Sequence, residues 1–415
     1  MVKNKMRFLK SLLLLFGFAS VVIPSCNSNA SVTVTTPEAS DVIATSTLEP
    51  AHAASPIQMP VIEQTHTPKP NDTPGLIVTL VGGGYADLGM PRFSPNGKIV
   101  ALAGAVIRFW DANSHEMIRE LKNPYGGKCF ASSAQFSPDS KLFAMTFGDC
   151  GIITNSDDFT GHLLVWDIST GNLLQEWEQI YAKMPPSNVN FSDYTIPVKA
   201  MIFLPDSSGI IFANRNSLEI GYIFHDKKQD VLELGQEMYA SQISISPDGK
   251  LVYVLMDWMK TNDLFESWSE QYKLQVWDVT SHTMIRENKY PESWSTLDLS
   301  LLGTLLVEKD YKKKSSQVTD LKTDEVKSMP YCSGLLEFYN MDTSLMTCEK
   351  IIDDNQVVEI WNTNSQEKVY TFTPDFEKDL IHSITGMAFN PGNTVLAIAH
   401  NDQISLWRIQ TEVQP

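Results

Sequence analysis

The sequence has few basic residues for its length. Against 32 Lys and Arg stand 49 Asp and Glu, which gives a formal net charge of −17 at pH 7. Binding to a phosphate backbone requires clustered Lys and Arg, because these side chains neutralise the phosphates. The only basic run, Asp310-Tyr311-Lys312-Lys313-Lys314, is short and is interpreted as a solvated turn. We therefore expect no nucleic-acid partner and no attraction to anionic lipid headgroups.

Motifs for covalent chemistry are also missing. The chain has no Gly-x-Ser-x-Gly, no His-Glu-x-x-His and no phosphate-binding loop. Its 8 His are scattered, and His in turns or at strand ends is usually solvated. The run Asn155-Ser156-Asp157-Asp158 offers oxygen ligands for calcium, but it lacks the glycine and the closing glutamate of a known calcium loop. The sequence thus predicts no catalytic residues, no cofactor and no dedicated metal site, with calcium at this run left open.

Composition divides the chain into three segments. Residues 1–26 begin with basic side chains, continue through the apolar run Leu12–Phe18 and end in small residues, which is typical of a secretory signal. The apolar run is too short to span a bilayer comfortably. Residues 27–75 are rich in Ser, Thr and Pro without a sustained apolar period, which predicts a disordered stalk. Residues 76–415 remain as the folded domain.

The signal ends in Val22-Ile23-Pro24-Ser25-Cys26. This ending resembles the lipobox of bacterial lipoproteins, in which the Cys becomes the lipidated first residue of the mature protein. Ile23 and Ser25 match the pattern, whereas Pro24 departs from it. The resemblance implies lipidation at Cys26 and contact with a membrane only through that anchor. Ordinary cleavage near Ser28-Asn29-Ala30, or an uncleaved anchor, is the alternative, and each of these places the domain outside the cytoplasm.

From residue 76 onward one pattern repeats. Its first half is an apolar strand ending in a tight turn, as in Phe93-Ser94-Pro95-Asn96-Gly97-Lys98, Phe136-Ser137-Pro138-Asp139-Ser140-Lys141 and Ile245-Ser246-Pro247-Asp248-Gly249-Lys250, with looser copies at Phe203–Ser208 and Phe389–Asn393. Its second half is a strand closing on Trp, at Trp110-Asp111, Trp166-Asp167, Trp277-Asp278, Trp361-Asn362 and Trp407. The spacings leave no room for crossover helices, so antiparallel four-strand units in series are predicted.

Two units are degenerate, and one strand is displaced. We place Phe224 at the Trp position of segment 200–234, and Thr319-Asp320 replaces Trp-Asp in segment 296–328. Segment 336–372 keeps Trp361 without the Ser-Pro turn, which brings the count to seven units. Too few residues follow Trp407 for a fourth strand, so we expect Leu76–Leu80 to complete the last unit and cover its edge. In the alternative reading, Leu76–Leu80 is merely the end of the stalk.

These repeats resemble the WD40-repeat family across residues 76–415. The Ser-Pro-Asp-Gly-Lys turn alone is shared with TolB-type propellers, and the Trp-Asp pair that follows favours WD40. The family's Gly-His dipeptide is absent throughout. The resemblance implies an all-β fold: a seven-bladed β-propeller of four-stranded antiparallel blades, closed by the N-terminal strand.

The cysteines fit this fold as local staples. Of the 5, Cys26 belongs to the signal. Cys129 and Cys150 flank the first two strands of blade two, and Cys332 and Cys348 occupy the same two places in blade six. We predict the disulfides Cys129–Cys150 and Cys332–Cys348, which suit an oxidising compartment. Four unpaired buried thiols are the alternative, and a zinc site is not expected because the spacing lacks Cys-x-x-Cys.

Long insertions fall on the same rim of the predicted ring as the cysteines. They are Gly148–His162, Glu178–Val198, Asp257–Tyr272 and Pro374–Ser383. They carry aromatic and acidic residues that a solvated loop does not require, among them Tyr181, Phe191, Tyr194, Trp258, Phe265, Trp268, Tyr272, Asp157 and Asp158. Rigid aromatics among polar groups are typical of contact surfaces. We predict that this rim contacts a protein or cell-surface ligand, although the rings could instead pack onto the blades.

The sequence therefore favours a non-catalytic, monomeric binding or scaffold propeller displayed outside the cytoplasm. A propeller enzyme of the metal-dependent lactonase or quinone-dependent dehydrogenase type, using the central channel, is the alternative. Against it, no carboxylate or His recurs at the channel-facing first strands. A structural component of a surface layer is a third possibility that the sequence leaves open.

Overall fold

Seven four-stranded antiparallel sheets make up the part of the chain described by the computed structural model. That part comprises residues 75–81, 89–104, 106–122, 124, 130–148, 158–183, 201–214, 217–223, 228–234, 239–261, 267–290, 295–310, 312–332, 336–337, 344–352, 355–374, 384–400 and 403–409. All of them belong to one unit, Ala54–Pro415. No helix long and apolar enough to cross a membrane occurs among these residues. The predicted signal, and the predicted stalk before Gly75, lie outside them.

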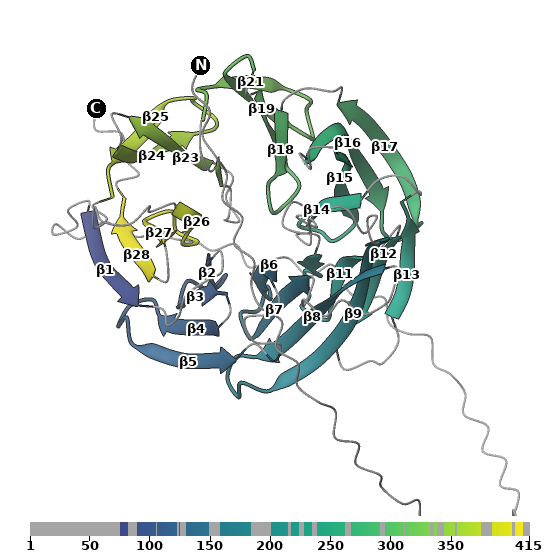
Figure 1. Cartoon of the computed structure of the whole chain (residues 1–415), viewed down its shortest axis with the longest axis horizontal. Helices are drawn as coiled ribbons and strands as arrows, with labels where there is room; N and C mark the ends of the chain where they lie inside the picture. Colours follow the sequence, from purple (N-terminus) through teal and green to yellow (C-terminus); the bar gives the residue numbers. More distant parts are fainter. Residues whose placement is uncertain are drawn as a thin grey trace, which may run out of the picture. The chain divides into compact units, whose positions relative to one another are not determined.

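The sheets surround a common centre, and each blade except the seventh is built in chain order from the inside outward (Figure 1). The first strands lie innermost: β2 (Met90–Phe93), β6 (Phe130–Phe136), β10 (Met201–Phe203), β14 (Tyr239–Ile245), β18 (Ser295–Leu299), β22 (Leu336–Glu337) and β26 (Ile384–Phe389). The second strands are β3 (Ile99–Ala103), β7 (Leu142–Gly148), β11 (Gly209–Asn214), β15 (Leu251–Thr261), β19 (Leu305–Asp310), β23 (Leu345–Ile352) and β27 (Val395–His400).

The third strands carry the Trp positions: β4 (Val106–Asp111), β8 (Asp158–Asp167), β12 (Ser217–Tyr222), β16 (Ser267–Asp278), β20 (Ser315–Asp320), β24 (Asn355–Asn362) and β28 (Gln403–Arg408). The fourth strands are outermost: β5 (Met117–Lys122), β9 (Leu173–Lys183), β13 (Lys228–Glu233), β17 (Thr283–Tyr290), β21 (Val326–Met329), β25 (Lys368–Phe372) and, in blade seven, β1 (Gly75–Val81). The predicted all-β, seven-bladed architecture is confirmed.

Strand β1 closes the ring as predicted. It pairs antiparallel with β28, from Gly75 opposite Arg408 to Val81 opposite Gln403. Leu80 is 5% exposed and packs in a cluster with blade seven and with blade one, where it meets Val100 and Trp110. The first described strand of the chain therefore joins the last one.

The turns between first and second strands lie on one edge of the ring, which we call the turn edge. Pro at the second position of the turn presets φ, and the fourth position takes a left-handed conformation, at Gly97 with φ 71° and at Ser140 with φ 62°. Ser is not favoured there, but its hydroxyl has a partner in the preceding blade. The Ser140 Oγ accepts the Asn96 N–H at 3.1 Å, and the Ser207 Oγ accepts the Asp139 N–H at 3.1 Å. Adjacent turns are thereby connected.

The Asp of each Trp-Asp pair shapes the turn into the fourth strand. The Asp167 carboxylate accepts the Ser169 hydroxyl at 2.6 Å and the Thr170 N–H at 2.7 Å, and these bonds lower the pKa of Asp167 below its ordinary 3.8. The backbone N–H of Ser114 likewise lowers the pKa of Asp111, and that of Ser281 lowers the pKa of Asp278. Blade six has a neutral version, in which the Asn362 Oδ1 accepts the N–H groups of residues 364 and 365.

These carboxylates make stability depend on acid. A folded-state pKa below the unfolded value contributes stability that is fully present above about pH 4 and is lost as pH falls through the folded pKa. We expect the midpoint of thermal unfolding to stay level from pH 7 to about pH 5 and to fall below about pH 4. Replacing Asp167 by Asn, the residue that blade six uses, should reduce that fall. An equal fall in wild type and Asp167→Asn, followed by circular dichroism, would contradict this role.

Blade three corrects one sequence prediction. The β11–β12 register sets Ile210 opposite Gly221, as Phe143 is set opposite Trp166 in blade two, so Gly221 holds the Trp position. Phe224, which we had placed there, lies outside the described residues. A Cβ on Gly221 would lie 2.6 Å from the ring of Trp177, which belongs to β9 of blade two. An indole from the neighbouring blade thus fills the space that the local Trp fills elsewhere.

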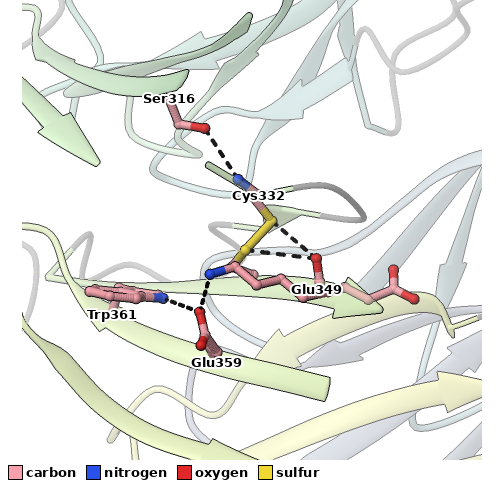
Figure 2. The surroundings of a disulfide bond; sticks show 7 residues. Ser316, Cys332, Glu349, Glu359 and Trp361 are labelled. Carbon is pink, nitrogen blue, oxygen red and sulfur yellow. Dashed lines mark hydrogen bonds and ion pairs between the residues drawn. A yellow bond between two sulfur atoms is a disulfide. The ribbon is translucent and has the colours of Figure 1, made fainter. Parts of the chain in front are cut away.

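Blade six is held by the disulfide Cys332–Cys348, which confirms one of the two predicted pairs (Figure 2). Its innermost strand β22 has only two residues, which pair with Cys348 and Thr347. Cys332 precedes that strand, and both sulfurs are buried against the Glu349 carbonyl oxygen, at 3.5 and 3.7 Å. The bond thus secures the chain where strand pairing is short. Cys129 and Cys150 lie outside the residues that the structure describes.

Loss of this bond is expected to destabilise the domain. The cysteines are 16 residues apart, and closing a loop of this length is worth about 3 kcal/mol in the chain-entropy account. We expect Cys332→Ala with Cys348→Ala to lower the free energy of unfolding by about that amount in guanidinium titrations. Placing Cys129→Ala and Cys150→Ala in both proteins removes any contribution from the other predicted pair. An unchanged unfolding midpoint in that background would contradict the assignment.

Candidate functional site

Two blades extend beyond the ring at the edge opposite the turn edge. In blade four, β15 and β16 stay paired past the start of β14, from Asp257 opposite Tyr272 to Thr261 opposite Ser267. In blade two, β8 and β9 stay paired past the end of β7, as far as Asp158 opposite Lys183. We call these two extensions the ribbons and this edge the ribbon edge. The sequence predicted loops at both places, whereas the described residues form strands.

The ribbons carry several of the predicted contact residues. In the backbone register Trp258 lies opposite Gln271, and Trp268 lies opposite Lys260. Asp158 begins β8, and Tyr181 lies in β9 at a register shift. The structure therefore brings Trp258 and Trp268 onto one ribbon, and Asp158 and Tyr181 onto the other. The remaining predicted residues that lie outside the described part are Asp157, Phe191, Tyr194 and Phe265.

Tyr272 is placed differently from the others. It is half-buried and packs at the junction of blades four and five, in a cluster with Leu255, Leu274 and Leu297. Its ring contributes to the joint between blades, as the alternative reading of the insertions allowed. At the base of the blade-four ribbon, this aromatic residue therefore packs onto the blade.

Polar side chains of the innermost strands connect neighbouring blades. Arg92 Nε donates to the Ala134 carbonyl at 2.8 Å, and Gln135 Nε2 donates to the Met201 carbonyl at 3.2 Å. In blade four, Gln242 Nε2 donates to Asp298 Oδ1 at 2.8 Å. The repeat pattern did not predict a role for these residues, although two of them, Arg92 and Gln135, share one signal, a polar side chain three residues before the turn Pro. They position the channel wall.

A cavity of about 110 Å³ opens at the turn edge, where the innermost strands converge. Its wall comes from blades one to five and seven. Five turn prolines surround it, with Leu301 and Leu302 in blade five, and the rings of Phe93, Phe136, Phe203 and Phe389 lie among the lining residues. Arg92 and Gln135 supply polar atoms to the same wall. The cavity is thus predominantly apolar.

Blade six holds a charged cluster around the buried carboxylate of Glu359, near the disulfide (Figure 2). Glu359 accepts Lys350 Nζ at 2.6 Å and Trp361 Nε1 at 3.1 Å, and Lys368 Nζ lies 3.3 Å away. Burial opposes ionisation of Glu359, but its contacts with Lys350, Trp361 and Lys368 together outweigh burial and lower the pKa of this carboxyl. Lys350 also lies 5.7 Å from the centre of the Trp361 ring. The carboxylate is thus held charged, and its contacts fix the Trp within the blade.

Comparison with known proteins identifies the fold but no family and no function. No protein-family model matches the chain, and no curated protein matches it. Among solved structures, the β-propeller domain of Cps50 (Swd1) from Myceliophteria thermophila is similar, with a TM-score of 0.55. The likeness covers 81% of this chain and 100% of that domain, at 12% sequence identity. The likeness shows a shared fold. At this identity it says nothing of ligand or activity.

Proposed function

We propose that this propeller is a non-catalytic binding module that holds a protein or cell-surface ligand at its ribbon edge. The observation that carries the proposal is the pair of ribbons, because each prolongs a rigid blade outward and places predicted contact residues beyond the ring. Sites built on the strands of a scaffold are positioned more precisely than sites on loops. Aromatic residues in such positions are the usual anchors of protein interfaces.

We further propose that the domain works outside the cytoplasm, tethered through Cys26 as a monomer. The disulfide Cys332–Cys348 supports this location, because such bonds persist in oxidising compartments and are rare in the cytosol. The signal-like residues 1–26 and the lipobox-like ending support it independently. The net charge of −17 favours a partner that is not a nucleic acid.

The experiment is affinity capture with the purified domain, followed by titration of the captured partner. Trp258→Ala with Trp268→Ala should weaken binding at least tenfold, because two aromatic anchors are removed. The matched control is Met284→Ala with Ile285→Ala, two exposed apolar residues on β17 of the same blade, away from the ribbon. Unchanged binding by the Trp pair would overturn the site assignment.

The non-catalytic assignment has its own test. Purified, dialysed protein is expected to carry no stoichiometric metal by elemental analysis. Metal at one equivalent per chain would favour the propeller-enzyme alternative, in which several blades supply ligands around the channel.

A further inference from the structure

The wall of the turn-edge cavity contains residues that the geometry of the turns does not require. Proline at the second turn position is explained by backbone geometry. The next position is polar in blades one to four, where Asn96, Asp139, Asp206 and Asp248 accept hydrogen bonds within the turn. In blade five that position is Leu302, which is half-buried and lines the cavity with Leu301. A leucine there contributes nothing to the turn and enlarges the apolar wall.

The wall is also held in place before any ligand arrives. Prolines fix the backbone on both sides of the opening, and the Ser140 and Ser207 hydroxyls connect successive turns. Arg92 and Gln135 bond to the neighbouring innermost strands. A preformed apolar site avoids the ordering cost that otherwise reduces affinity.

Size and chemistry then select the ligand. Engineered apolar cavities of about 150 Å³ bind benzene, so 110 Å³ with an open mouth suits one six-membered ring. The lining rings of Phe93, Phe136, Phe203 and Phe389 favour an aromatic guest through edge-to-face contacts. The Arg92 guanidinium, held by its bond to the next blade, adds an attraction for the face of an aromatic ring. We propose that the turn-edge cavity binds a single-ring aromatic molecule of the phenol class.

The test uses phenol and cyclohexanol, which share the same carbon-oxygen skeleton and a hydroxyl group, whereas only phenol is flat and aromatic. Calorimetric titration of the full chain should show one saturable phenol site with a dissociation constant between about 10 µM and 10 mM. Cyclohexanol should bind about tenfold more weakly. Absence of saturable phenol binding would overturn the site, and equal binding of cyclohexanol would overturn its aromatic preference.

Variants locate the site. Leu302→Asn, which installs the residue found at Asn96, should weaken phenol binding about tenfold while the turn is retained. The control Val326→Asn removes an apolar side chain that is 55% exposed on β21 of the same blade, and should bind phenol as wild type does. Phenol should also shift the methyl resonances of Leu301 and leave those of Val326 unchanged, a measurement that does not depend on any variant folding. Unchanged affinity in Leu302→Asn would overturn the assignment.

The two sites are separable. Trp258→Ala with Trp268→Ala, at the opposite edge, should bind phenol normally. Unchanged capture of the ribbon-edge partner by this variant, with phenol binding intact, would therefore count against the proposed function alone.

Discussion

A chain that begins at residue 82, and so lacks β1, is expected to lose its cooperative unfolding transition and to aggregate. Without β1, blade seven ends at β28, whose backbone N–H and C=O groups would form a bare edge. Unpaired edges of this kind template association between chains. The cluster of Leu80 with Val100 and Trp110 would also be opened to water at the junction with blade one.

A pair of point variants on β1 tests this closure without deleting it. Leu80→Ala should lower the free energy of unfolding by about 2–5 kcal/mol, because Leu80 is 5% exposed and its loss leaves a cavity. Leu76→Ala, on the same strand at 54% exposure, should change stability by less than about 0.5 kcal/mol. Chemical denaturation of the two proteins gives the comparison. Equal stability of the two would show that β1 does not seal the ring in solution.

Replacing Trp177 by Ala is expected to lower the free energy of unfolding by about 3–5 kcal/mol. The indole is 3% exposed, stacks on Phe212 of blade three with ring centres 5.7 Å apart, and joins a cluster drawn from two blades. Its removal therefore empties the joint between blades two and three. The measurement is the unfolding midpoint and slope in guanidinium.

Gly221, which faces Trp177, supplies a control substitution whose effect on stability can change sign when that ring is removed. Gly221→Ala alone should destabilise by about 1–3 kcal/mol, since the new Cβ would meet the Trp177 ring at 2.6 Å. In the Trp177→Ala background the same change should be neutral or stabilising, because the Trp177 ring is gone and the Phe212 ring, 3.0 Å from the new Cβ, can move into the emptied space. Additive effects of the two substitutions would mean that these residues do not share the space.

Much of the fold was predictable from the sequence because the repeats are local. A turn such as Ser137–Lys141 and a pair such as Trp166-Asp167 each determine their own strands, and short spacings leave one way to connect them. The closing strand was predictable from a shortage of residues after Trp407. The pairing of Cys332 with Cys348 was predicted correctly because both were placed on one rim of a single blade, where its first two strands are adjacent.

What the sequence did not reveal depends on contacts between blades. Phe224 resembled the missing Trp in local spacing, yet the space belongs to Trp177 of another blade, which no pattern within one repeat reports. The ribbon of blade four was predicted as a loop because the longer spacing between its repeat motifs indicated an insertion. Leu302 has no signal in the sequence, because its role depends on six turns that meet around one cavity.

The closure by β1 also bears on the order in which the protein is made. The first strand of the domain to leave the ribosome is the last to find its partner, because β28 is synthesised at the other end of the chain. Until then β1 remains an apolar strand with no neighbour, and long-range pairing of this kind slows folding and exposes chains to misassembly. If the chain is exported with its N-terminus first, β1 crosses the membrane before β28 and remains unpaired until β28 follows. The ring can then be completed only after translocation ends, so the domain would reach its working compartment before it acquires its final shape.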